Sequence, residues 1–400
     1  MKALSLLVRL LLPAISALPG PAAERVVEVR FHGNYSIADA EMARLAGISS
    51  LTSPGAVSSD EIVRRLEKSG RFDWVRVEKR YLSMTDTERV VLLVTVREKE
   101  PVRSKFMFFP ILSLTDEYGF TYGLRVTAID LLGAGERLSM PLSWGGERQA
   151  AIESRFDISG PIIDSFSAGA GLHRKENPHF EIGDFRSRVW GSVHRRLGRF
   201  DLEMDAGWSS VDFGSIHEDF ASYGAGITLD TRDNVILPRD AVYAGFGWEK
   251  MDVSGGPEID RYKADLRGYK RLFGQAVLAG QTLWHIAGDS LPVYQKPFLG
   301  GAATLRGYEP GEFVGDNLFL SSVELRLPLA SPRAVHRSGI SFFFDLGAAY
   351  DHGTSFGGAE VKHGAGLGFF FFLAGLGIKV DLAYDLHDSV RLHFGTGFRF

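Results

Sequence analysis

The chain has no cysteine among its 400 residues, which excludes disulfides, thiol nucleophiles and cysteine-ligated zinc. It also lacks the repeated apolar runs of about twenty residues that helical membrane proteins carry. The net charge is only −4, so nothing in the composition points to nucleic acid as a partner. No glycine-rich phosphate loop and no metal-binding histidine spacing is found. We therefore expect no nucleotide, no metal and no other cofactor.

Glycine and phenylalanine are abundant, with 46 and 29 residues. From about residue 104 onward, apolar and polar residues alternate in segments of roughly ten to fourteen residues, each bounded by turn-forming residues. The last segment shows the pattern most clearly. One face carries Val390, Leu392, Phe394, Thr396, Phe398 and Phe400, and the other face carries Arg391, His393, Gly395, Gly397 and Arg399.

The two faces of these segments require different surroundings. The polar face carries charges of both signs and needs water, whereas the apolar face would form a large exposed patch on a soluble monomer. A closed β-barrel in a bilayer satisfies both faces and every backbone group. We therefore predict a mainly β protein in which residues 101–400 form an antiparallel transmembrane barrel of about sixteen strands. The alternative is a soluble β-sandwich, whose outer faces would be polar and whose strands would be shorter.

The N-terminal part differs from the rest. Residues 1–23 are typical of a secretory signal peptide, with Lys2, an apolar stretch over Leu4–Leu12 and the small residues Ala22 and Ala23. A short membrane anchor is the alternative for this stretch. Residues 24–100 have the patterns of a small α+β domain in the order strand, helix, helix, strand, strand. Ser36 is expected to cap the first helix, and Ser58 with Glu61 has the spacing of a capping box.

One connection is exceptionally long. Residues 289–316 separate two strand patterns, near Gln275–Ala287 and Asn317–Leu327. Loops of this length are usually functional or folded back on the protein.

Several motifs together resemble the BamA, TamA and two-partner-secretion superfamily of outer-membrane assembly proteins. Leu305, Arg306, Gly307 and Tyr308 in the long loop are similar to the family's Arg-Gly-aromatic motif. Asp230, Arg232, Asp233 and Asn234 resemble its hairpin motif, and residues 343–347 resemble its Phe-x-Asp-x-Gly strand. The final strand ending in Phe400 looks like an assembly signal. Residues 24–100 resemble one polypeptide-transport-associated (POTRA) domain.

The resemblance implies a loop that plugs the barrel, and the residues suggest how the plug is held. Arginine is always charged and needs acceptors inside a barrel. Glu324 and Asp345 are expected to point inward on the two strands after the loop, so we predict that Arg306 bridges them. Gly307 would let the backbone turn tightly beside the wall. The alternative is a loop arginine exposed to solvent.

A second candidate site is the junction between the first and last barrel strands. Pro110 lies within the first strand and cannot donate a ladder hydrogen bond, and Gly395 and Gly397 weaken the last strand, which ends at Phe400. We predict that this junction, called the seam below, opens sideways so that a client strand can pair with the exposed edge. The family's lateral gate is similar. The alternative is an ordinary closed barrel with a tolerated proline.

The functional prediction is a non-enzymatic outer-membrane insertase or translocase of a Gram-negative bacterium, with its POTRA domain in the periplasm. The expected partners are unfolded or partly folded client polypeptides and outer-membrane lipid, and the resemblance adds periplasmic chaperones or accessory lipoproteins. In the POTRA domain, strand 74–82 is either an edge that receives clients or part of a passive spacer. Alternatives for the whole protein are a secretion channel for one exoprotein, a passive pore, and a barrel hydrolase that uses Asp385 and His387.

Overall fold

The computed structural model describes residues 25–35, 37–48, 58–81, 89–98, 105–131, 133, 135–158, 160, 162–329, 337–373, 376–396 and 400. The predicted signal peptide, Ser36 and Gly397 lie outside these residues. The chain forms two units, with the principal boundary between Pro101 and Val102. No helix in the described part of the chain is long and apolar enough to cross a membrane.

The first unit is a three-stranded sheet covered by two helices. Its elements are β1 (Arg25–His32), α2 (Asp39–Ala46), α3 (Ser59–Lys68), β2 (Phe72–Tyr81) and β3 (Arg89–Glu98). The sheet has the order β1-β3-β2, with β1 parallel and β2 antiparallel to β3. Met42, Ile62 and Leu66 of the helices pack with Leu92 and Val94 of the central strand in one buried core. The strand β2 is therefore an edge of this sheet.

The capping box predicted in the first unit is not formed. Ser58 is the N-cap residue of α3, but its side chain makes no capping hydrogen bond. Glu61 instead forms an ion pair with Arg65, one helical turn further on. That pair is an i,i+4 contact on the exposed helix surface, and it competes for the carboxylate that a capping box would use.

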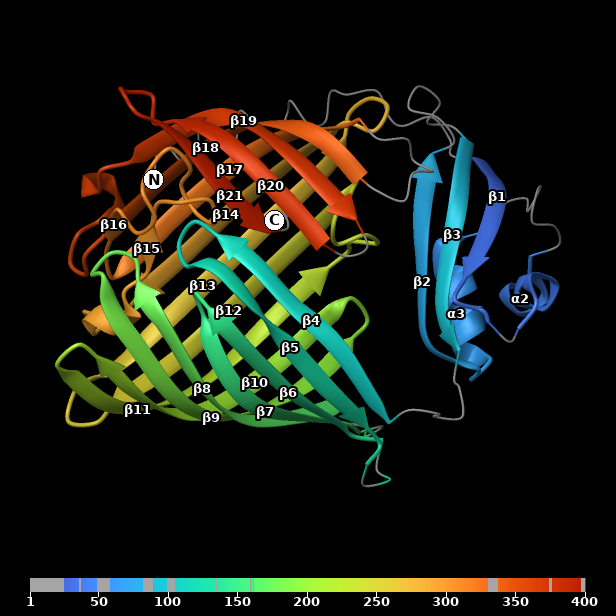
Figure 1. The fold of residues 1–400 in the computed structure, drawn as a ribbon, viewed down its shortest axis with the longest axis horizontal. Coiled ribbons are helices and arrows are strands. Elements are labelled where there is room, and N and C mark those ends of the chain that lie inside the picture. The colour runs from blue at the N-terminus through green and yellow to red at the C-terminus, as the bar shows by residue number, and fades with distance from the viewer. Residues whose placement is uncertain are drawn as a thin grey trace. The chain divides into compact units, whose positions relative to one another are not determined.

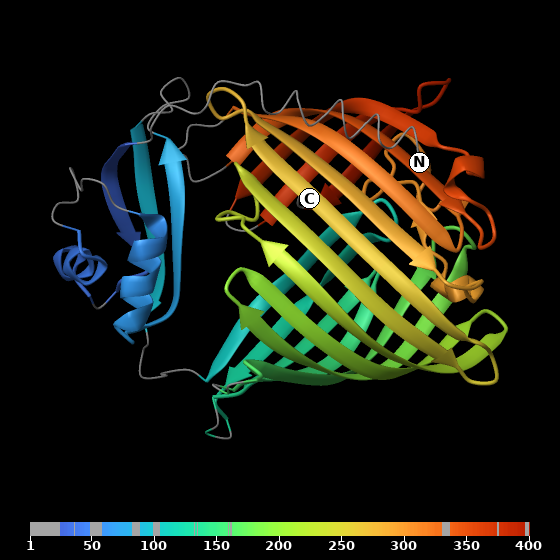
Figure 2. The ribbon, with the colours of Figure 1, turned by 180° about the vertical axis from the view of Figure 1, so that it is seen from behind.

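The second unit is a closed antiparallel barrel of sixteen strands (Figures 1 and 2). Its strands are, in chain order, β4 (Phe106–Thr115), β5 (Gly119–Ile129), β6 (Arg137–Gly145), β7 (Arg148–Asp157), β8 (Ser165–Asn177), β9 (Ile182–Leu197), β10 (Phe200–Phe213), β11 (Ile216–Asp230), β12 (Ala241–Val253), β13 (Glu258–Arg271), β14 (Val277–Ala287), β17 (Asn317–Pro328), β18 (Arg337–Tyr350), β19 (Lys362–Leu373), β20 (Leu376–Tyr384) and β21 (Val390–Thr396).

Side chains alternate between the two faces of the barrel wall. On β10, Met204 and Trp208 are 63% and 46% exposed on the outer face. Glu203 and Asp205 of the same strand line a cavity on the inner face. The outer apolar surface is what a hydrocarbon environment requires, and the mixed charges inside require water or ion pairs. The prediction of a sixteen-stranded barrel is confirmed.

The barrel closes where β21 meets β4. Their register contains one residue pair among the described residues, Gly395 with Thr115. The neighbouring strands β4 and β5 have a long continuous register of ten residue pairs. Beside the single pair, the hydroxyls of Ser113 and Thr396 lie 3.4 Å apart. Among the described residues, the seam therefore shows a short register.

Phe400 differs from the prediction that it lies on the outward apolar face of the last strand, whose residues 397–399 lie outside the described part of the chain. The strand β21 ends at Thr396, and Phe400 is only 3% exposed rather than facing outward. Arg326 of β17 donates from Nη2 to the Phe400 carbonyl oxygen at 2.6 Å, and its guanidinium lies 5.0 Å from the Phe400 ring centroid. A buried arginine needs acceptors, and the Phe400 carbonyl oxygen is one of those available to Arg326.

Candidate functional site

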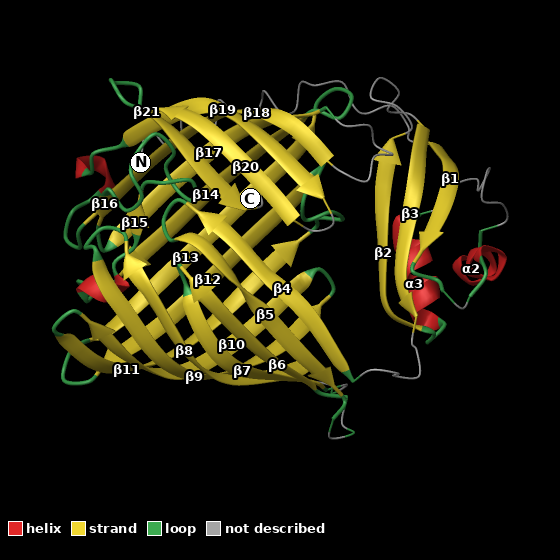
Figure 3. Ribbon diagram, viewed as in Figure 1, coloured by secondary structure: helices red, strands yellow, loops and turns green. Residues whose placement is uncertain are grey.

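The long loop between β14 and β17 has structure of its own. It contains the helical turn η1 (Val293–Gln295) and the paired short strands β15 (Phe298–Leu299) and β16 (Phe313–Val314). It lies at one end of the barrel, where the turn η2 (Phe356–Gly358) also lies (Figure 3). Leu299, Leu305 and Tyr308 of the loop are buried with Leu318 and Leu320 of β17. We call residues 302–309 the loop tip.

Arg306 is the most extensively paired residue of the loop tip. It is 1% exposed, and it donates to both carboxylate oxygens of Asp345, from Nε at 2.7 Å and from Nη2 at 2.8 Å. Its Nη1 lies 3.2 Å from Glu324 and 3.1 Å from Asp381. The guanidinium also stacks 3.3 Å from the ring centroid of Phe343. The geometry is the two-pronged carboxylate contact for which arginine is suited.

Around Arg306 lies a buried charge cluster, which we call the lumen cluster. Lys379 donates to Glu324 at 2.9 Å, and Arg326 donates to the same carboxylate at 3.1 Å. The members are the cations Arg306, Arg326 and Lys379 and the anions Glu324, Asp345 and Asp381, all under 9% exposed. Three positive and three negative charges balance, so each carboxylate has a cation beside it. Burial of such groups is tolerable only when all of them are paired.

The backbone of the loop tip approaches the barrel wall very closely. Gly307 has φ +101°, a conformation that only glycine adopts without strain. At Gly364 of β19, a Cβ would come within 1.9 Å of the Arg306 carbonyl oxygen. Both glycines are therefore required for the arginine to reach its acceptors.

The loop tip also touches both sides of the seam. Asp116, in the turn after β4, accepts from the Ala302 N–H at 3.0 Å, and Glu117 accepts from the Ala303 N–H at 3.0 Å. On the other side, His393 of β21 accepts at Nε2 from the Gly307 N–H at 3.0 Å. His393 Nδ1 lies 2.5 Å from Asp116, which joins the two sides directly. These contacts supplement the single strand pair of the seam.

The two acidic residues of this turn have opposite pKa shifts. Burial raises the pKa of Glu117 to about 7, with the neighbouring negative charge of Asp116 as the second cause. Burial also opposes ionisation of Asp116, but hydrogen bonds from His393 and Glu117 hold its pKa below the usual range. Glu117 is therefore the protonated partner of the pair at mildly acidic pH.

The raised pKa of Glu117 predicts that the loop tip is held more firmly at pH 5 than at pH 8. The stabilisation is fully present below the ordinary value of 4.5 and is lost as the pH rises through about 7. That of Asp116 is lost only below 3.8, outside this window. Hydrogen-exchange protection factors of the Ala302 and Ala303 amides should fall between pH 5 and 8. In Glu117→Gln they should change less, and an unchanged pH dependence in this variant would contradict the assignment.

The base of the loop is anchored to a different part of the wall. The Tyr294 hydroxyl donates to Glu218 of β11 at 2.6 Å, and Arg186 of β9 donates to the Tyr294 carbonyl oxygen at 2.6 Å. Lys296 bridges Asp316 and Asp351 at 3.1 and 3.0 Å. The loop is therefore fixed at two separate places, its base on β9–β11 and its tip on β17–β21.

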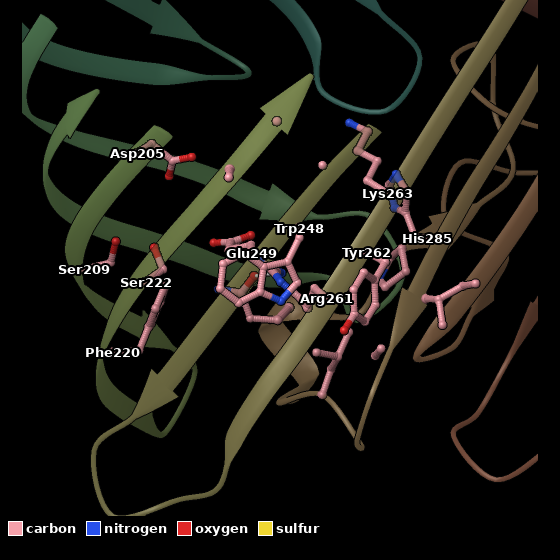
Figure 4. Close-up of a pocket in the computed structure, with 18 of the residues that line it drawn as sticks. Asp205, Ser209, Phe220, Ser222, Trp248, Glu249, Arg261, Tyr262, Lys263 and His285 are labelled. Atoms are coloured by element: carbon pink, nitrogen blue, oxygen red, sulfur yellow. Dashed lines mark hydrogen bonds and ion pairs between the residues drawn. The ribbon is translucent and has the colours of Figure 1, made fainter. Parts of the chain in front are cut away.

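A polar cavity of about 650 Å³ lies on the inner face beside the loop base (Figure 4). Its lining includes the acidic residues Asp205 and Glu249 and the basic residues Arg261, Lys263 and His285. Arg261 donates to Glu249 at 2.5 Å and to Gln295 of the loop at 3.0 Å. The mixed charges are typical of a hydrated lumen and favour no single ligand.

The hairpin motif lies at the opposite end of the barrel, in the turn between β11 and β12. Arg232 donates to both carboxylate oxygens of Asp230, at 2.9 and 2.8 Å, and lies 4.8 Å from the ring centroid of Tyr243. Asn234 accepts from the N–H groups of Ile236 and Leu237. Asp233 lies in the same turn. These contacts shape the turn, and they are separate from the lumen cluster.

The sequence analysis predicted that Arg306 contacts Glu324 and Asp345, and the structure places these three side chains in contact. It missed Asp381, Lys379, Asp116 and His393. Alternation along β20 already placed Lys379 and Asp381 on the polar face, but nothing local to the sequence indicated that they reach the loop. Pro110 faces outward on β4, opposite Leu124, and Gly395 forms the seam pair.

Asp385 and His387 do not form the dyad that a hydrolase would need. The Asp385 carboxylate accepts from the backbone N–H groups of His387, Asp388 and Ser389 at 2.9–3.1 Å. It closes the turn between β20 and β21 instead of orienting an imidazole. Among the described residues, no group of three or more histidine, aspartate or glutamate side chains is arranged to hold a metal ion.

Comparisons with known proteins agree with this geometry. The sequence profile of the Omp85 superfamily domain matches residues 115–400. The structure is similar to BamA from Haemophilus ducreyi lacking POTRA domains 1–3, at 14% identity, with a TM-score of 0.65 and coverage of 95% of this chain and 85% of that one. CdiB from Acinetobacter baumannii matches at 13% identity (TM-score 0.52, coverage 94% and 74%). CdiB from Escherichia coli matches at 11% identity (TM-score 0.56, coverage 94% and 76%). A comparison with curated protein sequences gives no significant match.

Proposed function

Because this chain belongs to the Omp85 superfamily, we propose that it inserts client polypeptides into the outer membrane, or passes them through it, by opening its seam. The observation that carries this proposal is the single described residue pair between β21 and β4. An edge with few ladder bonds can be exchanged for a client strand at small cost. The protein acts without catalytic residues, and client folding supplies the driving force.

The proposed opening begins at the loop tip. Asp116 and His393 lie on opposite sides of the seam, and both contact the loop tip. Release of the loop tip would leave four described links across the seam: the Gly395–Thr115 pair, the contacts of Thr396 with Ser113 and with the Leu114 N–H, and the His393–Asp116 contact. A client strand could then pair with β4, whose outer face carries Phe106, Phe108 and Leu112.

We further propose that the first unit is a POTRA domain that lies in the periplasm. Its element order and its edge strand β2 support this. An edge strand such as β2 offers a side at which an extended client segment can pair by β-augmentation. A passive spacer is the alternative, and it predicts that client binding is unaffected by blocking this edge. Accessory lipoproteins or chaperones would be further partners.

Depletion of the protein, followed by quantitative proteomics of the outer membrane, tests this function. An insertase predicts a broad loss of other β-barrel proteins. Loss of a single exoprotein would instead assign a dedicated secretion channel, the second candidate favoured by the likeness to CdiB. An unchanged outer membrane and secretome would contradict both and leave a passive pore.

A further inference from the structure

Two arginines occupy adjacent positions on the outer face of the barrel. Arg148 begins β7, Arg174 lies near the end of β8, and the two form a register pair at the end that carries the long loop. Ile152 and Leu172 lie on the same face of these strands and are 47% and 48% exposed. Alternation therefore directs both arginines to the outside, just beyond the apolar band.

The pair is unusual because its charges are not compensated. Like charges directly opposite on neighbouring strands are destabilising. Yet neither arginine forms a hydrogen bond or an ion pair with any described residue, and both are exposed. Glu176 is on the same face but does not pair with them. Two other sets of outward charges at this end do form ion pairs, Asp212 with His217 at 2.5 Å and Lys250 with Glu258 at 2.9 Å.

The basic residues on the inner face of the same strands are engaged. His173 lies 3.6 Å from Glu147, and Lys175 donates to the Tyr118 hydroxyl at 3.1 Å. The mismatch is therefore confined to the outer face. A bound anion would relieve it.

The neighbours of the pair indicate where that anion comes from. On one side, Tyr122 and Trp144 form a register pair and are 50% and 51% exposed. On the other side, Phe185 of β9 is opposite Arg174. Outward aromatic residues form the girdle at the membrane–water interface of such barrels. The two guanidinium groups thus lie at the level of lipid headgroups.

We infer that Arg148 and Arg174 bind the phosphate of an anionic lipid headgroup at the end of the barrel that carries the long loop. Guanidinium groups bind phosphate through paired charge-assisted hydrogen bonds. The inference rests on the membrane embedding in the proposed function but not on client transport. The ligand class is a lipid with a phosphate monoester.

Native mass spectrometry of the full chain in detergent micelles tests this inference, with phosphatidic acid as the probe and phosphatidylcholine as the neutral lipid. The wild type should retain phosphatidic acid at least tenfold more strongly than phosphatidylcholine. Arg148→Gln with Arg174→Gln should lose this preference at least tenfold, and lysine at both positions should retain part of it. If the double variant does not fold, the two single variants are measured, and each should lose a substantial part.

Arg137 and Arg155 supply the matched control. They also form an arginine register pair, but on the inner face at the opposite end, and Arg155 lies 3.0 Å from Asp157. Glutamine at both positions should leave lipid retention unchanged. If the Arg148 and Arg174 double variant retained phosphatidic acid as strongly as the wild type, the inference would be overturned. Displacement of the lipid by millimolar inorganic phosphate would also overturn it and would assign a free-phosphate site. Failure to insert into bilayers would instead contradict the proposed function.

Discussion

Replacing Arg306 by alanine is expected to destabilise the docked loop by about 3–5 kcal/mol, the usual cost of removing one partner from a buried ion pair. The change leaves Glu324, Asp345 and Asp381 with only Arg326 and Lys379 as cations. Asp345 loses both of its guanidinium contacts and keeps its hydrogen bond from Ser322. A difference of this size shifts the docking equilibrium by about two to three and a half orders of magnitude.

Two measurements follow this change in the purified barrel. The temperature at which the folded band is lost on a heat-modifiability gel should fall, and proteases should cut within residues 289–316 of the variant. Arg306→Lys should lower this temperature and expose the loop almost as much as Arg306→Ala, because an ammonium cannot reproduce the two parallel hydrogen bonds to Asp345.

Arg125→Ala is the matched control for Arg306. Arg125 also forms an ion pair on the inner face, with Glu153 at 2.6 Å, but its side chain is 39% exposed and does not touch the loop. Its loss should cost about 0–1 kcal/mol. Suppose that Arg306→Ala and Arg125→Ala lost the folded band at the same temperature, and that their long loops resisted proteases equally. The lumen cluster would then not be what holds the loop tip.

The parts of this fold that could be predicted follow from local patterns. Alternation along β10 separates an apolar face from a charged face. A closed barrel accommodates both, because one face can meet lipid and the other can meet water. Alternation also placed Glu324 and Asp345 on the inner face, close along the chain to the loop that needs them. The contact of Arg306 with these two residues was accessible to sequence reasoning for that reason.

The remaining contacts depend on how the barrel closes. Asp381 is 75 residues from Arg306, and His393 is 277 residues from Asp116. Only the stagger of the strands determines which inward side chains meet at such separations. Phe400 continues the apolar alternation in the sequence, yet it is buried, and its carbonyl oxygen accepts a hydrogen bond from Arg326. A contact of this kind cannot be predicted from the alternation along one strand.

The second large effect is expected from locking the seam. The hydroxyls of Ser113 on β4 and Thr396 on β21 are 3.4 Å apart, so cysteines at these positions are close enough to be joined. Because the natural chain has no cysteine, no competing disulfide can form. If the seam must open for a client strand to pair, the oxidised variant should lose nearly all activity. Reduction should restore it.

The control disulfide joins two strands away from the seam. Thr127 of β5 and Ser139 of β6 form a register pair, and their hydroxyls are 3.0 Å apart. Cysteines there test whether a cross-strand disulfide is harmful in itself. This oxidised variant should be as active as the wild type.

The most direct measurement is therefore complementation by the Ser113→Cys, Thr396→Cys variant in cells depleted of the wild-type protein, with outer-membrane composition as the readout. The account predicts no rescue while the seam is oxidised, rescue after reduction, and full rescue by the Thr127→Cys, Ser139→Cys control under both conditions. Full rescue by the oxidised seam variant, with the disulfide verified by mass spectrometry, would contradict lateral opening.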